Sequence, residues 1–164
     1  PFLDPRDLTG NKLDVGAGGQ SFLPPPVISL DRLRGNPGTN YGYIVVPGRE
    51  LPFGKHNFGW IHCSHLLEDF AEGDWQKVIQ SMVRSLTYHP HGLLTLLVPD
   101  RVKFRANVAA GAPDNLDHKH EFDLCQISDF IHQWTRNQNF QSVCEKHVGD
   151  YSILYVGRKV GYIA

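Results

Sequence analysis

The spacing of apolar residues changes part of the way along the chain. The first part contains short apolar runs separated by glycine, proline and polar residues, and each run has the length of a β-strand. Four strands are predicted there, at residues 12–15, 27–30, 43–46 and 59–63. Apolar residues then recur at every third or fourth position from Trp75 to Leu86. That spacing predicts an α-helix with one buried face and with Asp74 as its N-cap.

The second half of the chain continues the alternation of strands and helices. Residues 93–98 form a continuous apolar run, which predicts a central strand covered on both faces. The segment from Arg101 to Glu121 is polar and longer than most connections, so we predict a loop there. A second helix is predicted from Asp123, because Asp123 and Gln126 have the spacing of a capping box. Its apolar stripe consists of Ile127, Phe130, Ile131 and Trp134.

The chain closes with two predicted strands, over residues 140–146 and 151–158. The short connection between them, residues 147–150, contains a glycine, as hairpin loops often do. Because the earlier strands alternate with helices, we expect parallel β-α units with this antiparallel hairpin added at the end. The sequence therefore predicts a three-layer, Rossmann-like α/β fold with a mostly parallel sheet. We expect residues 1–164 to form a single domain, and the start at Pro1 suggests that it was excised from a longer chain.

Composition narrows the class of protein. The formal net charge is -1 and there is no basic block, so a nucleic-acid partner is not indicated. No apolar run approaches the roughly 20 residues of a membrane span, so no membrane association is expected. The three cysteines show no C-x-x-C spacing, which favours reduced thiols and an intracellular, cytoplasmic protein.

The first predicted strand runs directly into a glycine loop, Gly16-Ala17-Gly18-Gly19. Such a loop lets the backbone turn tightly and approach a ligand closely. Asp31 ends the next strand, where a carboxylate can accept two hydrogen bonds from a ribose diol. Each feature also has a purely structural interpretation, the loop as a tight turn and Asp31 as a helix cap or a solvated turn residue.

The details of the loop distinguish between nucleotide cofactors. Ser21 stands where a dinucleotide-binding loop would have its third glycine, and the chain has no G-K-[ST] phosphate loop. Asp14, just before the loop, is a carboxylate that would repel a pyrophosphate and attract a cation. The sequence therefore favours an adenosine cofactor with a cationic group.

Several segments, taken in order, resemble class I S-adenosylmethionine (SAM)-dependent methyltransferases, and in particular the group labelled methyltransferase type 11. The resemblance rests on residues 13–19, 28–31, 51–53, 58–68, 93–99 and 118–122. It implies that S-adenosylmethionine is the cofactor, with its methionine end near Asp14 and the glycine loop, its ribose at Asp31 and its adenine bordered by the Leu-Pro-Phe segment 51–53. The cofactor-binding residues that it implies are Asp14, Gly16, Ala17, Gly18, Gly19, Asp31, Leu51, Pro52, Phe53, Cys63 and Ser64.

The same resemblance places His65 at the end of the fourth strand, facing the transferred methyl group and the substrate. Imidazole titrates near neutral pH, so His65 is the candidate general base toward a hydroxyl or amine acceptor. The alternative for His65 is a helix-start residue that packs near the cofactor. We expect an active methyltransferase whose acceptor is a small molecule, a sugar or a protein side chain. The predicted 101–121 loop would form part of the substrate wall.

A second hypothesis is a catalytically inactive methyltransferase-like module that binds a protein partner or regulates an adjoining domain. Departures from the family pattern favour it. Gln20 replaces a glycine, Pro47 replaces an acid, Gly59 replaces an aspartate, and Pro24-Pro25-Pro26 occupies the place of the usual first helix.

The histidines suggest a metal site only weakly. His118 and His120, and likewise His89 and His91, alternate on the chain and could each form a pair of ligands. Because no cysteine or third histidine stands at zinc-site spacing, we predict no bound metal.

Overall fold

A computed structural model of the chain describes residues 11–18, 23, 26–31, 45–46, 49–88, 92–136, 139–149 and 151–161. The predictions that involve Gly19, Gln20, Pro47, His89 and His91 therefore lie outside the described residues, as does the first half of the predicted strand 43–46.

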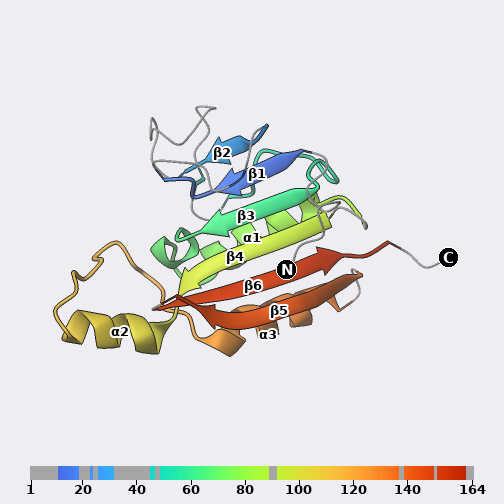
Figure 1. The fold of residues 1–164 in the computed structure, drawn as a ribbon. Helices are drawn as coiled ribbons and strands as arrows, with labels where there is room; N and C mark the ends of the chain where they lie inside the picture. The colour runs from blue at the N-terminus through green and yellow to red at the C-terminus, as the bar shows by residue number, and fades with distance from the viewer. Residues whose placement is uncertain are drawn as a thin grey trace.

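The described residues form a six-stranded mixed sheet (Figure 1). Four strands run parallel, in the order β2-β1-β3-β4, and β6 and β5 follow as an antiparallel hairpin at the end of the sheet. This arrangement confirms the predicted Rossmann-like sheet with a C-terminal hairpin. The strands are β1 (Lys12–Val15), β2 (Ile28–Leu30), β3 (Trp60–Ser64), β4 (Gly92–Pro99), β5 (Phe140–Val148) and β6 (Ser152–Lys159).

Two helices, α1 (Asp74–Ser85) and α3 (Leu124–Thr135), cover the same face of the sheet (Figure 1). The predicted N-cap of α3 is confirmed, because the Asp123 side chain accepts a hydrogen bond from the Gln126 amide at 3.1 Å. The N-cap of α1 is Gly73, with φ +87°, and Asp74 is the first residue inside the helix. There its carboxylate still lies at the positive end of the helix dipole.

Part of the predicted 101–121 loop is helical. Helix α2 (Arg101–Ala109) begins after Asp100, whose side chain accepts a hydrogen bond from the Lys103 amide. The prediction was wrong here because α2 has a single buried residue, Phe104, and so shows no apolar stripe. In Figure 1 the helix projects from the body at the end to which the parallel strands point.

Two other boundaries differ from prediction. Val45 and Val46 are not in a strand, and the Val45 amide donates to the carbonyl of Asp31, the residue after β2, at 2.9 Å. The hairpin connection is also shorter than predicted. Residues 147 and 148 belong to β5, and the turn begins at Gly149. Gly149 has φ +58°, a left-handed conformation that is common in tight hairpin turns.

The sheet separates two apolar clusters. The larger one lies between the sheet and helices α1 and α3. The smaller one lies on the other face and contains Leu23, Trp60, Leu93 and Val156. Within the described ranges, no helix is both long enough and apolar enough to span a membrane.

Candidate functional site

The strand order reverses between β1 and β3. From β1 the chain moves to β2 on one side and then returns to β3 on the other side. Ligands of open α/β sheets bind beyond the carboxyl ends of the strands at such a point. The glycine loop follows β1, Asp31 follows β2, and Ser64 and His65 stand at the end of β3. The fold therefore brings these predicted residues to one edge of the sheet.

The glycine loop fits tightly between the ends of β2 and β3. The amides of Gly16 and Ala17 both donate to the carbonyl of Leu30, at 2.8 and 3.0 Å. Gly16 has φ +83°, and a Cβ there would lie 2.7 Å from the Ser64 carbonyl oxygen and 2.8 Å from Cβ of Leu66. Only glycine satisfies both the conformation and this close approach. The loop is thus fixed by backbone contacts to both neighbouring strands.

Asp31 braces the same loop. One of its carboxylate oxygens, Oδ2, accepts a hydrogen bond from the Gly18 amide at 2.8 Å. The side chain is buried, with only 6% of the residue exposed, which excludes the solvated turn as a description. The structure places Asp31 directly beside the backbone that is predicted to hold the cofactor.

Asp14 belongs to a buried polar row that crosses the sheet. In the strand register it stands beside Ser29 on β2 and His62 on β3, and His62 stands beside Thr95 on β4. The ring nitrogen Nδ1 of His62 lies 2.7 Å from the Thr95 hydroxyl. Burial lowers the pKa of His62, the nearby charge of Asp14 opposes this effect, and His65 adds to the lowering. His62 is therefore neutral at physiological pH.

The charges of three carboxylates act on Cys63. Burial raises the pKa of the Cys63 thiol well above its usual range, and the negative charges of Glu68, Asp14 and Asp31 raise it further. Asp14 and Glu68 are each only 1% exposed. The Cys63 side chain lies in the large apolar cluster, so it is an inert thiol, and its predicted cofactor contact would have to be made by its backbone.

The Leu-Pro-Phe segment is held against α1. The Leu51 amide donates to the Ser81 hydroxyl at 2.8 Å, and the Leu51 side chain is buried in the large cluster. Phe53 is partly buried and makes an edge contact with Phe58, with ring centroids 4.9 Å apart. Pro52 is exposed. The role of this segment at the adenine stays a prediction.

Next to the glycine loop lies a group of side chains that we call the imidazole cluster, made of His65, Glu68, His118 and Ser152. The Glu68 atom Oε1 lies 3.4 Å from Nδ1 of His65 and 3.8 Å from Nε2 of His118. On the other side of the His65 ring, Nε2 lies 3.5 Å from the Ser152 hydroxyl. Sequence reasoning predicted only His65 here as a functional residue. Glu68 belongs to segment 58–68, which resembles the methyltransferase family. This resemblance was the one feature of the sequence that could have indicated a functional role for Glu68.

His118 and His120 each have a ring nitrogen close to a carboxylate oxygen. His118 faces Glu68, and His120 Nδ1 lies 3.1 Å from Oε2 of Glu72. Across the part of the chain that the structure describes, no group of three or more His, Cys, Asp or Glu side chains could hold a metal ion.

Leu23 lies away from the carboxyl ends of the strands. It follows the glycine loop in sequence, and a side chain there could in principle fill the cofactor position. Instead it is 3% exposed and packs against Trp60 and Leu93, near the amino ends of β3 and β4.

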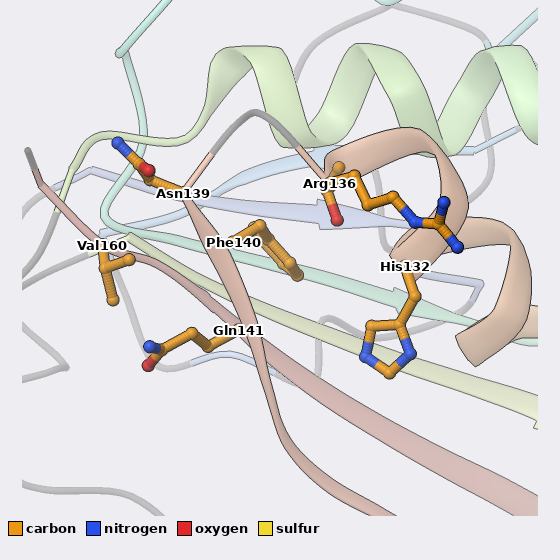
Figure 2. A pocket seen from close by; sticks show the side chains of 7 residues that line it. His132, Arg136, Asn139, Phe140, Gln141 and Val160 are labelled. Carbon is orange, nitrogen blue, oxygen red and sulfur yellow. The ribbon is translucent and has the colours of Figure 1, made fainter.

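A cavity of about 430 Å³ lies at the opposite edge of the sheet (Figure 2). The end of α3 and the start of β5 form it. The start of β5 pairs with the end of β6, which on its other side pairs with the amino end of β4. Its position therefore separates it from every predicted site residue. The lining residues are His132, Thr135, Arg136, Asn139, Phe140, Gln141 and Val160.

Comparisons with known proteins agree with the topology. No protein-family model matches the chain, and no curated protein matches its sequence. Solved structures do match. A Pyrococcus horikoshii protein has a TM-score of 0.70 at 16% sequence identity, over 92% of this chain and 82% of its own.

Two further matches are methyltransferases. The plantazolicin methyltransferase, solved in complex with SAH, has a TM-score of 0.67 at 9% identity, over 93% of this chain and 76% of its own. A SAM-dependent methyltransferase from Aquifex aeolicus has a TM-score of 0.61 at 12% identity, over 93% and 85%. The chain therefore has the fold of the class I methyltransferases, at low sequence identity to these proteins.

Proposed function

We propose that this chain, as a single domain, binds S-adenosylmethionine at the carboxyl ends of β1, β2 and β3 and transfers its methyl group to an acceptor. The observation that carries the proposal is that three buried carboxylates lie at neighbouring strand ends: Asp14 in β1, Asp31 just after β2 and Glu68 in the segment that follows β3. SAM bears a cationic sulfonium and an ammonium group, and a cluster of carboxylates attracts such a ligand. The same cluster would repel the phosphates of a dinucleotide.

The local geometry suits this cofactor. The loop at Gly16 turns back against β3, so a bound molecule can lie directly on its backbone. A Cβ at Gly18 would meet no atom of the described residues within 4 Å, in contrast to a Cβ at Gly16. In this proposal Asp31 holds the ribose hydroxyls, and Asp14 and residues 16–19 line the methionine end. Ser64 and the backbone of Cys63 border the methyl group, and residues 51–53 border the adenine.

Methyl transfer from SAM is a direct displacement, for which SAM supplies an activated methyl group. The contribution of the protein is to align the acceptor with the methyl carbon and to exclude water. His65 is the proposed general base, because it lies at the end of β3 and 37% of its side chain is exposed.

Calorimetric titration of SAM into the purified protein tests the proposal. We expect micromolar binding in the wild type. The Asp31→Ala variant should bind about 10- to 100-fold more weakly, because hydrogen bonds to a charged group contribute about 1.5–3 kcal/mol each. Asp31→Asn is a matched variant that can still accept from the Gly18 amide, and it should bind with intermediate affinity. Asp74→Asn, at the start of α1, should bind as the wild type does. No heat at millimolar SAM would overturn the proposal.

That negative result would favour the alternative, an inactive module that binds a protein partner or an adjoining domain. The alternative rests on departures from the family pattern. One of them, Gly59, lies in the described residues just before β3, where its amide donates to the Asn11 carbonyl at 2.9 Å. This departure is at the amino edge of the sheet, away from the proposed cofactor site.

A further inference from the structure

Glu68 is a carboxylate buried beneath the surface of the proposed site. It is 1% exposed, and its atom Oε2 has no hydrogen-bond partner among the described residues. Burying a charge in this way is costly unless other groups compensate for it. The groups that face Oε1 are the two imidazoles of His65 and His118. Glu68 is thus positioned to act on histidines.

The backbone fixes Glu68 and His65 in this arrangement. The amides of Lys119 and His120 both donate to the Glu68 carbonyl, at 2.8 and 3.0 Å, which holds the segment after α2 against it. His65 adopts φ +48°, a conformation that non-glycine residues rarely take, and its amide donates to the Leu97 carbonyl at 2.9 Å. Backbone strain of this kind is concentrated at functional sites.

The two ring nitrogens of His65 face different surroundings. Nδ1 points to the buried carboxylate, and Nε2 points to the Ser152 hydroxyl at the exposed side. Glu68 Oε1 and Nδ1 of His65 lie 3.4 Å apart, and because a carboxylate only accepts, a hydrogen bond between them would require a proton on Nδ1. In the neutral ring Nε2 then carries the lone pair. The Ser152 hydroxyl occupies the place where a proton-donating group would meet it.

His118 completes the arrangement by packing behind the carboxylate. Its side chain is 7% exposed, and its ring lies 4.8 Å from the ring of Phe104 on α2. Phe104 is also 5.8 Å, ring to ring, from Tyr151, which precedes Ser152. Helix α2 therefore supports the imidazole cluster through its one buried side chain.

We propose that Glu68, supported by His118, is a positioning residue that keeps the Nδ1 proton of His65 directed inward, so that Nε2 receives a proton from a hydroxyl or amine acceptor. This inference rests on the proposed methyl transfer. The acceptor O–H or N–H bond breaks and its proton moves to Nε2. The electron pair left on that oxygen or nitrogen forms the bond to the methyl carbon. The carbon–sulfur bond breaks, and its electrons stay on sulfur as a neutral thioether.

The first test measures the ring tautomer of His65 by ¹⁵N NMR in the protein without SAM, at pH 8, where an ordinary histidine is neutral. We expect the Nδ1–H form in the wild type. Glu68→Ala should shift His65 to the Nε2–H form that free imidazole side chains prefer. Glu68→Gln keeps an accepting oxygen and should retain Nδ1–H. An Nε2–H ring in the wild type would overturn the inference, and so would an unchanged ring in Glu68→Ala.

Folding of the variants is checked by near-ultraviolet circular dichroism. If Glu68→Ala does not fold, the comparison of the wild type with Glu68→Gln and His118→Asn replaces it. His118→Asn is expected to raise the fraction of Nε2–H, and no change in that fraction would contradict the part assigned to His118. These readouts need no SAM, so they separate a failure of this inference from a failure of SAM binding.

The second test addresses the acceptor class with two small probes. Phenol carries a hydroxyl, and anisole is the same ring with that proton replaced by a methyl group. Millimolar phenol should move the ¹⁵N signal of Nε2 in His65, and anisole should leave it in place. Ser152→Ala, which opens the position beside Nε2, should strengthen the phenol effect. Equal responses to the two probes, or no response to phenol, would contradict a site for a protic acceptor.

Discussion

The two halves of the proposed site share one edge of the sheet but are built differently. The cofactor half consists of Asp14, the glycine loop and Asp31, which lie close together in sequence and are joined mainly by backbone hydrogen bonds. The acceptor half is the imidazole cluster, which joins side chains from the segment after β3, the segment after α2 and the start of β6.

This difference has a physical consequence. The contacts of the glycine loop are fixed by strand ends and by the conformation of Gly16, so a substitution there disturbs the strands themselves. The imidazole cluster depends on side-chain orientation, so a substitution there changes chemistry with less effect on the sheet. We therefore expect substitutions in the cofactor half to lower the stability of the fold. Substitutions in the acceptor half should mainly change its chemistry.

The largest effect is expected for Gly16→Ala. The added Cβ would lie 2.7 Å from the Ser64 carbonyl oxygen, and the residue would keep φ +83°. Strained backbone costs about 1–3 kcal/mol, and overpacking adds about 1–3 kcal/mol. We expect the free energy of unfolding in urea to fall by about 3–5 kcal/mol, with loss of SAM binding.

Gly18→Ala is the matched control within the same loop. Its φ is +58°, but among the residues that the structure describes no atom lies within 4 Å of a Cβ there. Only the left-handed conformation is penalised, at about 1–2 kcal/mol. Equal losses of stability in Gly16→Ala and Gly18→Ala would show that the loop is not packed tightly between the ends of β2 and β3.

A smaller effect is expected for Asp100→Ala, at the start of the helix α2 that supports the acceptor half. Asp100 accepts from the Lys103 amide at 2.9 Å as the N-cap of α2, and its Oδ2 lies 3.0 Å from Nε2 of His147. Loss of an N-cap costs about 0.5–2 kcal/mol. We expect a loss in this range in urea unfolding at pH 7, with the sheet intact. Asp100→Asn, which can still cap the helix, should lose less.

The same residue gives a pH dependence. Burial raises the pKa of Asp100, but the hydrogen bonds from Lys103 and His147 outweigh burial, and the pKa lies below its usual value of 3.8. A lowered carboxyl pKa adds stability above the unfolded-state value and loses it as pH falls through the folded-state value. The stability difference between wild type and Asp100→Asn should therefore shrink below about pH 4. A difference that is as large at pH 2 as at pH 7 would contradict this assignment.

The cofactor half could be predicted from sequence because its parts are local. Apolar runs predicted β1, β2 and β3, and each run ends at a residue of the site. The brace between Asp31 and Gly18 spans 13 positions. The clash that requires glycine at position 16 involves Ser64 on another strand. The sequence therefore revealed that a glycine is present there, but not why no other residue fits.

The acceptor half could not be predicted in the same way. The contact between Glu68 and His118 depends on where α2 places the segment that follows it, and α2 itself was missed because Phe104 is its one buried residue. Ser152 meets His65 across 87 positions, through the pairing of β6 with β4. Contacts between distant segments leave no periodic pattern in the chain.

The central claim, a SAM site at the carboxyl ends of β1, β2 and β3, is tested most directly by following backbone amide signals in ¹H–¹⁵N NMR while SAM is added. We expect the amide signals of Gly16 and Gly18 to move in a saturable way as SAM is added. The signals of Arg136 and Gln141, at the distant cavity in Figure 2, should stay in place. Unmoved Gly16 and Gly18 signals at millimolar SAM, or changes confined to the distant cavity, would contradict it.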